Sequence, residues 1–165
     1  MLILAILLSV LMLLVLFFDI RRYIIPNWLV GLVVLFYPAL LIFSPTPINW
    51  QMALVACVGS FVIGFILFSS KVMGGGDVKL LAACCLWTGT QLLPLYLLYT
   101  SALGGILSVM LLLGRPIAHY YTARLCPDRP LPRLLQHGQP VPYGVAIAGA
   151  FLILLWTQKL VGMQW

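Results

Sequence analysis

The sequence predicts an all-α polytopic membrane protein with about six transmembrane helices, and three observations support this fold class. Hydrophobic residues make up 64% of the 165 residues and charged residues only 7%. The mean hydropathy is +1.15, a composition that excludes a soluble globular domain. The apolar residues form continuous runs without the alternation of a membrane β-barrel, so each run is expected to be a helix that satisfies its own backbone hydrogen bonds.

Six apolar segments are expected to form a single membrane domain over residues 1–165. Residues 2–18 have no Lys or Arg ahead of them and no small-residue cleavage site after them, which indicates a retained span and not a signal peptide. The loop before the third segment contains Pro45, Pro47 and Trp50, a composition typical of an uncharged connector at the membrane surface. The expected spans are 2–18, 28–43, 51–70, 79–90, 91–114 and 141–161.

The topology depends on a tight turn over Thr88–Gln91, which has to separate the fourth and fifth segments. Without this turn the later half of the topology inverts. Residues 115–140 carry Arg, His and several prolines, so they are interpreted as a basic loop at the membrane surface. Part of this loop could be an interfacial helix, but the prolines argue against one long helix.

The distribution of cations is expected to set the orientation of the chain. With the spans above, eight of the nine Lys and Arg residues fall on one side of the membrane and only Lys159 on the other. By the positive-inside rule that side is cytoplasmic, and both termini face outward. The net charge of +6 does not indicate a nucleic-acid partner, because the cations are spread over short loops. The eight are Arg21, Arg22, Lys71, Lys79, Arg115, Arg124, Arg129 and Arg133.

The acidic residues of the chain are Asp19, Asp77 and Asp128. Asp19 and Asp77 lie at the ends of apolar segments on the expected cytoplasmic face, where an ionisable group is costly and commonly functional. Asp77 follows Gly74–Gly76, whose missing side chains would let an extended peptide approach. Alternatively, these glycines form a loop and Asp77 is the N-cap of the fourth helix. Asp128 lies in a Pro-Asp-Arg-Pro sequence, where turn formation explains it without catalysis.

Two aspartates at one membrane depth have the stoichiometry of an aspartic protease. One ionised carboxyl group activates water and one protonated group polarises the scissile carbonyl, a division that is enforced when like charges are held close. Helix polarity favours Asp77 as the ionised member, because Asp77 precedes a helix amino end and Asp19 lies at a helix carboxyl end. Arg21 and Arg22 oppose this inference, since they stabilise a charged Asp19.

Three motifs in order resemble the type IV prepilin peptidases, membrane aspartyl proteases of the Gly-x-Gly-Asp type. The similarity is to their short form, which is associated with tight-adherence (Flp) pili. It covers most of the chain, and three ordered motifs are more specific than a lone Gly-x-Gly-Asp. The motifs are Asp19 with Arg22 and Ile25-Pro26-Asn27, then Gly74-Gly75-Gly76-Asp77-Val78-Lys79, then Pro142-Tyr143-Gly144-Val145-Ala146-Ile147-Ala148.

The resemblance implies that Asp19 and Asp77 are the catalytic pair of an endopeptidase in the bacterial inner membrane. It implies a prepilin-like substrate, cut at the cytoplasmic face between a short basic leader and an apolar helix. The lipid bilayer and the pilus-assembly machinery are the other implied partners. Arg22 and Lys79 could contact substrate or tune the aspartates, although both also suit ordinary membrane anchors. The supporting residues that the resemblance implies are Gly74, Gly75, Gly76, Lys79, Arg22, Pro26, Asn27, Tyr143 and Gly144.

The cysteines indicate neither a metal site nor a disulfide, and no cofactor is expected. Long bifunctional prepilin peptidases carry paired Cys-x-x-Cys motifs and also N-methylate the trimmed pilin. This sequence contains no Cys-x-x-Cys, so we expect peptidase activity without methyltransferase activity. His119 and His137 are expected to be solvated or interfacial and receive no role. The cysteines, expected to be three packing residues and one free thiol, are Cys57, Cys84, Cys85 and Cys126.

Two other functions stay open from the sequence. A proton-coupled small transporter or channel could use the same acids as a relay, although no acid lies near mid-membrane and the chain is short for a two-half transporter. A pilus-assembly subunit that retained the fold and lost catalysis is the other alternative. Asp-dependent cleavage of a prepilin peptide is expected from the peptidase alone.

Overall fold

A computed structural model describes residues 2–44, 47–125, 133–136 and 138–157 of the chain. Every regular element in these ranges is a helix, which confirms the all-α prediction. Three helical stretches are long and apolar enough to cross a membrane: α1 (Leu2–Arg22), α4 (Trp50–Ser69) and Gly75–Thr122 of α5 (Gly75–Leu125). The molecule is therefore a membrane helix bundle.

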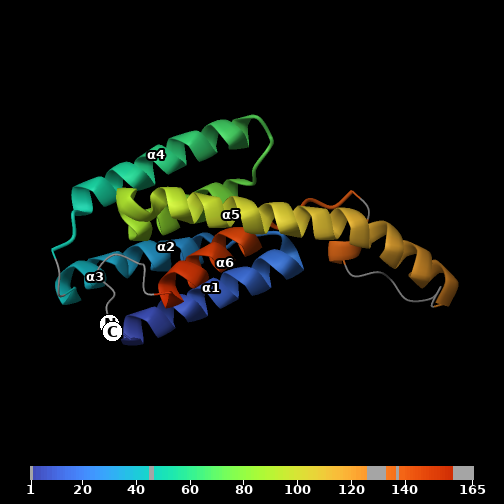
Figure 1. The fold of residues 1–165 in the computed structure, drawn as a ribbon, viewed down its shortest axis with the longest axis horizontal. Coiled ribbons are helices and arrows are strands. Elements are labelled where there is room, and N and C mark those ends of the chain that lie inside the picture. Colours follow the sequence, from blue (N-terminus) through green and yellow to red (C-terminus); the bar gives the residue numbers. More distant parts are fainter. Residues whose placement is uncertain (1, 45–46, 126–132, 137, 158–165) are drawn as a thin grey trace.

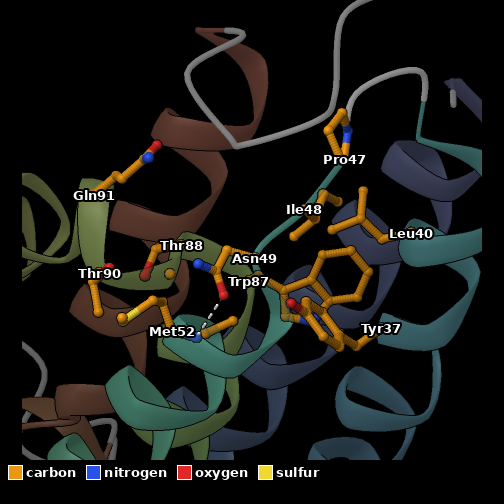
Figure 2. A pocket seen from close by; sticks show the side chains of 12 residues that line it. Tyr37, Leu40, Pro47, Ile48, Asn49, Met52, Trp87, Thr88, Thr90 and Gln91 are labelled. Atoms are coloured by element: carbon orange, nitrogen blue, oxygen red, sulfur yellow. Dashed lines mark hydrogen bonds between the residues drawn. The ribbon is translucent and has the colours of Figure 1, made fainter.

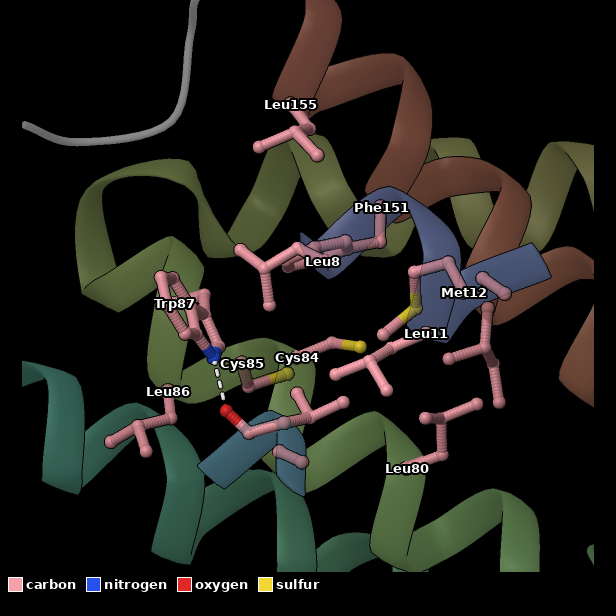
Figure 3. Close-up of a cluster of buried hydrophobic side chains, with 14 of the residues drawn as sticks. Leu8, Leu11, Met12, Leu80, Cys84, Cys85, Leu86, Trp87, Phe151 and Leu155 are labelled. Carbon is pink, nitrogen blue, oxygen red and sulfur yellow. Dashed lines mark hydrogen bonds between the residues drawn. The ribbon is translucent and has the colours of Figure 1, made fainter. Parts of the chain in front are cut away.

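The bundle is arranged around α5, with α4 on one side and the pair α1 and α6 (Tyr143–Trp156) on the other (Figure 1). The faces that meet are filled by closely packed apolar side chains, shown in Figure 3. Trp87 is buried among them, and its indole Nε1 donates a 3.0 Å hydrogen bond to the Val33 carbonyl. In lipid such van der Waals packing and buried hydrogen bonds hold helices together. The core includes Leu8 and Met12 of α1, Leu80, Cys84 and Cys85 of α5, and Phe151 and Leu155 of α6.

The expected span over 28–43 is present as the apolar helical stretch Asn27–Phe43, which a single turn residue divides into two helices. These are α2 (Asn27–Leu35) and α3 (Tyr37–Phe43), which meet at Phe36. Pro38 is in the first turn of α3 and has no N–H to donate to the carbonyl four residues earlier, so the hydrogen-bond ladder of α2 cannot continue through it.

The tight turn expected at Thr88–Gln91 is present, although helical residues flank it directly on both sides. Gly89 has φ 57° and ψ −175°, a backbone conformation open almost solely to glycine. Cys84 and Tyr96 would be about 18 Å apart along an uninterrupted helix, yet their side chains interact. The chain thus reverses at Gly89, and Figure 1 shows the two arms of α5 overlapping at that end.

The basic stretch begins as a helix, as the sequence allowed, because Pro116 does not interrupt it. The second arm of α5 passes through Pro116 and continues to Leu125, beyond the ends of α1 and α4 (Figure 1). Pro116 leaves one backbone carbonyl without its helical donor, which water tolerates better than lipid does. Arg115 joins this arm to the following chain, since its guanidinium donates 3.2 Å hydrogen bonds to the carbonyls of Leu134, in the short 3-10 helix Arg133–Leu135, and Pro140.

A candidate active site between two aspartates

Asp19 and Asp77 meet in one open pocket of about 400 Å³, as their common membrane depth suggested. Asp19 lies in the last turn of α1 and is only 4% exposed. Asp77 lies in the first turn of α5 and is half-buried. The two carboxyl groups come from helices that are 58 positions apart in sequence (77 − 19) and interact electrostatically. The remaining lining consists of Tyr23, Ile24, Ile25, Pro26, Asn27, Gly74, Gly75 and Gly76.

One wall of the pocket is the segment that follows α1. The helix ends after Arg22, and Tyr23 takes a left-handed backbone conformation with φ 53°. The next residues have no regular secondary structure up to Pro26, which is extended with φ −61° and ψ 136° and precedes α2. Ile25 is buried and Ile24 is 65% exposed, so this wall is fixed by one side chain and presents the other to the surroundings.

The glycine run forms the opposite wall and is not the loop considered from the sequence. Gly75 and Gly76 are the first residues of α5, and the Val78 N–H donates to the Gly74 carbonyl at 3.1 Å. Asp77 is therefore a first-turn residue and not the N-cap. A Cβ on Gly76 would lie 3.3 Å from the Ile25 Cβ and 3.6 Å from the Ile25 backbone nitrogen. Glycine at this position lets the two walls approach each other.

The amino end of α6 closes the pocket on the side of Asp19. The Val145 N–H donates a 3.1 Å hydrogen bond to Asp19 Oδ2. The Gly144 N–H interacts with the carboxyl groups of both Asp19 and Asp77. A Cβ on Gly144 would lie only 2.7 Å from Asp19 Oδ2, so a side chain there would displace the carboxylate. Gly144 is thus in contact with the pair.

This arrangement suits acid–base chemistry on a bound molecule. Two carboxyl groups held close in a poorly solvated place repel when both are ionised, so one proton shared by the pair is favoured. The backbone N–H groups of α6 stabilise the remaining negative charge. The site can therefore present one proton acceptor and one proton donor to the same reacting atoms.

Three other residues suggested by the sequence, Lys79, Arg22 and Tyr143, are not part of the pocket lining. Lys79 is exposed, and its Nζ donates a 3.1 Å hydrogen bond to Asn27 Oδ1 at the pocket rim. The Arg22 guanidinium lies 5.6 Å from the Phe18 ring centroid in a cation–π contact. Tyr143 is 38% exposed and precedes Gly144 at the start of α6.

Sequence reasoning missed Tyr23 and Ile24 in the pocket wall, and the Val145 amide at Asp19. Tyr23 has no local signal for its backbone conformation apart from its place between a helix end and Pro26. The Val145 contact joins residues 126 positions apart, and a backbone donor leaves no trace in the residue type.

The cysteines and histidines considered in the sequence analysis do not line this pocket in the part of the chain that the structure describes. Cys84 and Cys85 are buried and Cys57 is half-buried, all as free thiols, which agrees with their interpretation as packing residues. Over residues 2–44, 47–125, 133–136 and 138–157, His, Cys, Asp and Glu side chains form no cluster suited to a metal ion. Cys126, Asp128, His137 and Lys159 lie outside the described residues.

A second pocket, of about 330 Å³, lies at the opposite end of the bundle, beside the Gly89 turn (Figure 2). Its lining combines aromatic side chains such as Tyr37 and Trp87 with the polar residues Asn49, Thr88 and Gln91. Asn49 caps α4 through a 3.2 Å hydrogen bond from the Met52 N–H. No acid or base lines this pocket, so the groups capable of proton transfer are those at the aspartate end.

Comparison with known proteins gives a family match and several curated relatives. Residues 6–109, which include both aspartates, match the model of the type IV leader peptidase family. A prepilin leader peptidase/N-methyltransferase of Pseudomonas aeruginosa is 39% identical over 90 residues, covering 53% of this chain and 24% of the relative. Proteins of the same name from Aeromonas salmonicida and Stutzerimonas stutzeri are 35% identical over 97 residues and 33% identical over 90 residues.

The chain spans about a quarter of the length of these curated relatives, with 27% of the Aeromonas salmonicida protein and 25% of the Stutzerimonas stutzeri protein covered. The similarity covers 58% and 53% of this chain, respectively. No solved structure matches. The family match includes more than half of the chain and both walls of the pocket. The chain belongs to the type IV leader peptidase family.

Proposed function

We propose that this protein is a membrane aspartic endopeptidase that removes the leader peptide of prepilin-like subunits, with Asp19 and Asp77 as its catalytic pair. The observation that carries the proposal is the meeting of these two carboxyl groups, from α1 and α5, in one open pocket. The family membership and the relatives' names, which specify a prepilin leader peptidase, support the substrate class.

The chemistry needs only the two carboxyl groups and water. The ionised carboxylate takes a proton from water as its oxygen attacks the scissile carbonyl carbon, while the protonated carboxyl group donates its proton to the carbonyl oxygen. In the collapse of the resulting tetrahedral diol, the newly protonated carboxyl group gives its proton to the amide nitrogen, the other carboxylate takes a proton from a diol hydroxyl, and the C–N bond breaks. Each carboxyl group thus returns to its starting protonation state, and the pair is ready for another cycle.

The pocket suits an extended peptide bond better than a compact ligand. It is open to one side, and three glycines leave its α5 wall without side chains. A backbone can therefore reach the carboxyl groups without meeting a Cβ. The association with tight-adherence pili rests on the motif pattern of the short form, and parallel digestion of Flp-type and longer type IV prepilins would test it.

The pocket is proposed to face the cytoplasm from the inner membrane. Basic residues gather at the pocket end of the bundle, with Arg21 and Arg22 in the last turn of α1 and Lys71 between α4 and α5. Lys79 follows Asp77 in α5, so the same end carries the positive charge that the positive-inside rule assigns to the cytoplasm.

Single-cysteine labelling should verify this orientation. In a chain whose four native cysteines are replaced, a membrane-impermeant maleimide added to intact cells is expected to label Ser44→Cys and to leave Ser70→Cys unlabelled. Permeabilising the cells should make Ser70→Cys reactive, which controls for burial. Labelling of Ser70→Cys in intact cells would place the pocket on the outer face and contradict the proposed leader cleavage.

Cleavage of a synthetic prepilin, consisting of a basic leader and an apolar helix, tests the proposed function against its two alternatives. Protein purified in detergent is expected to release the leader at one peptide bond. A proton-coupled transporter would move protons in liposomes and leave the peptide intact, and an inactive assembly subunit would bind without cutting. Intact peptide after prolonged incubation with folded protein would overturn the proposal.

The purified 165-residue chain is also expected to cleave without methylating its product. It contains no Cys-x-x-Cys motif and no glycine-rich nucleotide loop, and the reaction above uses neither a methyl donor nor a metal. Mass spectrometry of the new amino terminus, with and without S-adenosylmethionine, measures the first expectation, and cleavage in EDTA measures the second. A donor-dependent gain of one methyl group, or loss of cleavage in EDTA with recovery on zinc addition, would contradict it.

A further inference from the structure

Helix α6 begins without a capping side chain of its own. Its N-cap residue is Pro142, which offers no side-chain acceptor to the first amide groups of the helix. Such N–H groups need acceptors, and in lipid or at its border an unsatisfied donor is costly. Asp19 of α1 supplies a side-chain acceptor, since its Oδ2 receives the Val145 N–H at 3.1 Å, while the same N–H also reaches the Pro142 carbonyl at 3.2 Å.

The contact is sterically specific as well as electrostatically favourable. Asp19 Oδ2 occupies the space that a side chain at position 144 would need, 2.7 Å from the ideal Cβ position. The same Cβ position is 2.8 Å from Ile25 Cδ1, in the pocket wall. A side chain at position 144 would therefore collide with both the carboxylate and Ile25, and only glycine there lets the carboxylate reach the amide groups.

We propose that the amino end of α6 is a positioning element for the catalytic pair, which orients the Asp19 carboxylate and stabilises the single negative charge that the pair carries. This inference rests on the proposed function. Val145 acts through its backbone N–H and Gly144 through its N–H and its missing side chain. Both residues act through the carboxyl groups and contact neither the substrate nor the attacking water in this scheme, so both are positioning residues.

The charged and titratable side chains around Asp19 do not replace α6 in orienting and stabilising its carboxylate. On α5 the group that faces Asp19 is Asp77, whose charge opposes that of Asp19. On α1 itself, the guanidinium groups of Arg21 and Arg22 lie over Phe17 and Phe18, 4.6 and 5.6 Å from the ring centroids. Lys79 of α5 bonds to Asn27, and on α6 the neighbouring titratable side chain is the partly exposed Tyr143. The backbone donors of α6 thus stabilise Asp19 directly, and at Asp77 the Gly144 N–H acts together with the Gly74 N–H that precedes α5.

Replacing the Val145 amide by an ester tests the inference most cleanly. Semisynthesis with the α-hydroxy analogue of valine removes one N–H and keeps the side chain. Because a hydrogen bond to a charged group is lost, kcat on the synthetic prepilin is expected to fall about ten- to a hundred-fold with KM little changed. The donor favours the ionised carboxyl form, so without it the acidic limb of the kcat/KM profile should move to higher pH. The same ester at Ala150, inside α6, removes one intrahelical N–H away from the pair and is the matched control for the lost backbone bond to Pro142.

Side-chain variants provide an independent arm. Gly144→Ala is expected to reduce kcat by at least the same factor, since its Cβ displaces Asp19 Oδ2. Gly104→Ala is its control, because a Cβ there makes ordinary 3.6 Å contacts with Ala146 and Tyr143 at the same end of α6. If Gly144→Ala fails to fold, as judged by gel filtration, the ester decides alone.

The outcomes separate this inference from the proposed function. A Val145 ester with the kcat and pH profile of the unmodified chain would overturn the positioning role and leave the peptidase intact. An unmodified chain that does not cleave at all would instead overturn the proposed function.

Discussion

Asp19→Asn and Asp77→Asn are each expected to lower the rate of leader cleavage about 10³- to 10⁴-fold. Asparagine keeps the shape of the side chain but can neither accept nor donate the proton that the pair transfers in each cycle. Single-turnover rates on the synthetic prepilin in detergent measure the effect. Both variants should still insert and purify as wild type does, because neither substitution changes the volume of the packed core.

Asp128→Asn is the matched control, since it makes the same chemical change at the only other acid of the chain. It is expected to cleave at a rate near that of wild type. Rapid cleavage by either of the first two variants would rule out a mechanism that uses both carboxyl groups. A comparable loss in Asp128→Asn would show that the assay reports charge or folding and not catalysis.

Gly76→Val is expected to reduce cleavage at least about a hundred-fold, because small displacements of reacting groups are this costly. A Cβ at position 76 already lies within 3.3 Å of Ile25, so the larger valine has to push the extended wall away from α5. That movement widens the pocket and shifts Asp77 relative to Asp19. The same single-turnover assay measures the loss, and thermal stability in detergent reports whether the bundle is intact.

Gly31→Val is the control for the added bulk and branching, since a Cβ at position 31 of α2 meets no atom within 4 Å. Its cleavage rate should stay within a few-fold of the wild-type rate. Equal activity of the two variants would mean that the close approach of Gly76 and Ile25 is unimportant for catalysis.

Much of the fold could be predicted from the sequence, because lipid dictates helices wherever the chain is continuously apolar. The predicted span 51–70 differs from α4, Trp50–Ser69, by one residue at each end. The Gly89 turn was also predicted, since six spans require it. The break at Phe36 and the extension of α5 to Leu125 were not, because proline in a helix has different consequences in different surroundings.

The candidate site was predictable in its side chains but not in its backbone. Asp19 and Asp77 could be paired from their membrane depth alone, since each lies at the border of an apolar segment on the same face of the membrane. Helix polarity along the sequence suggested that Asp19 lies at an unfavourable helix end. The structure shows that Asp19 also lies at the amino end of α6, where the helix favours a negative charge. A contact across 126 positions cannot be derived from local patterns.

The central claim is that Asp19 and Asp77 together cut a prepilin leader, and cleavage in a reconstituted membrane tests it most directly. Full-length synthetic prepilin would be placed in liposomes with either the wild-type chain or the Asp19→Asn, Asp77→Asn double variant, and new amino termini identified by mass spectrometry. We expect one new terminus, at the junction of the basic leader and the apolar helix, with wild type and none with the double variant. The same terminus with both proteins, or none with wild type, would contradict the claim.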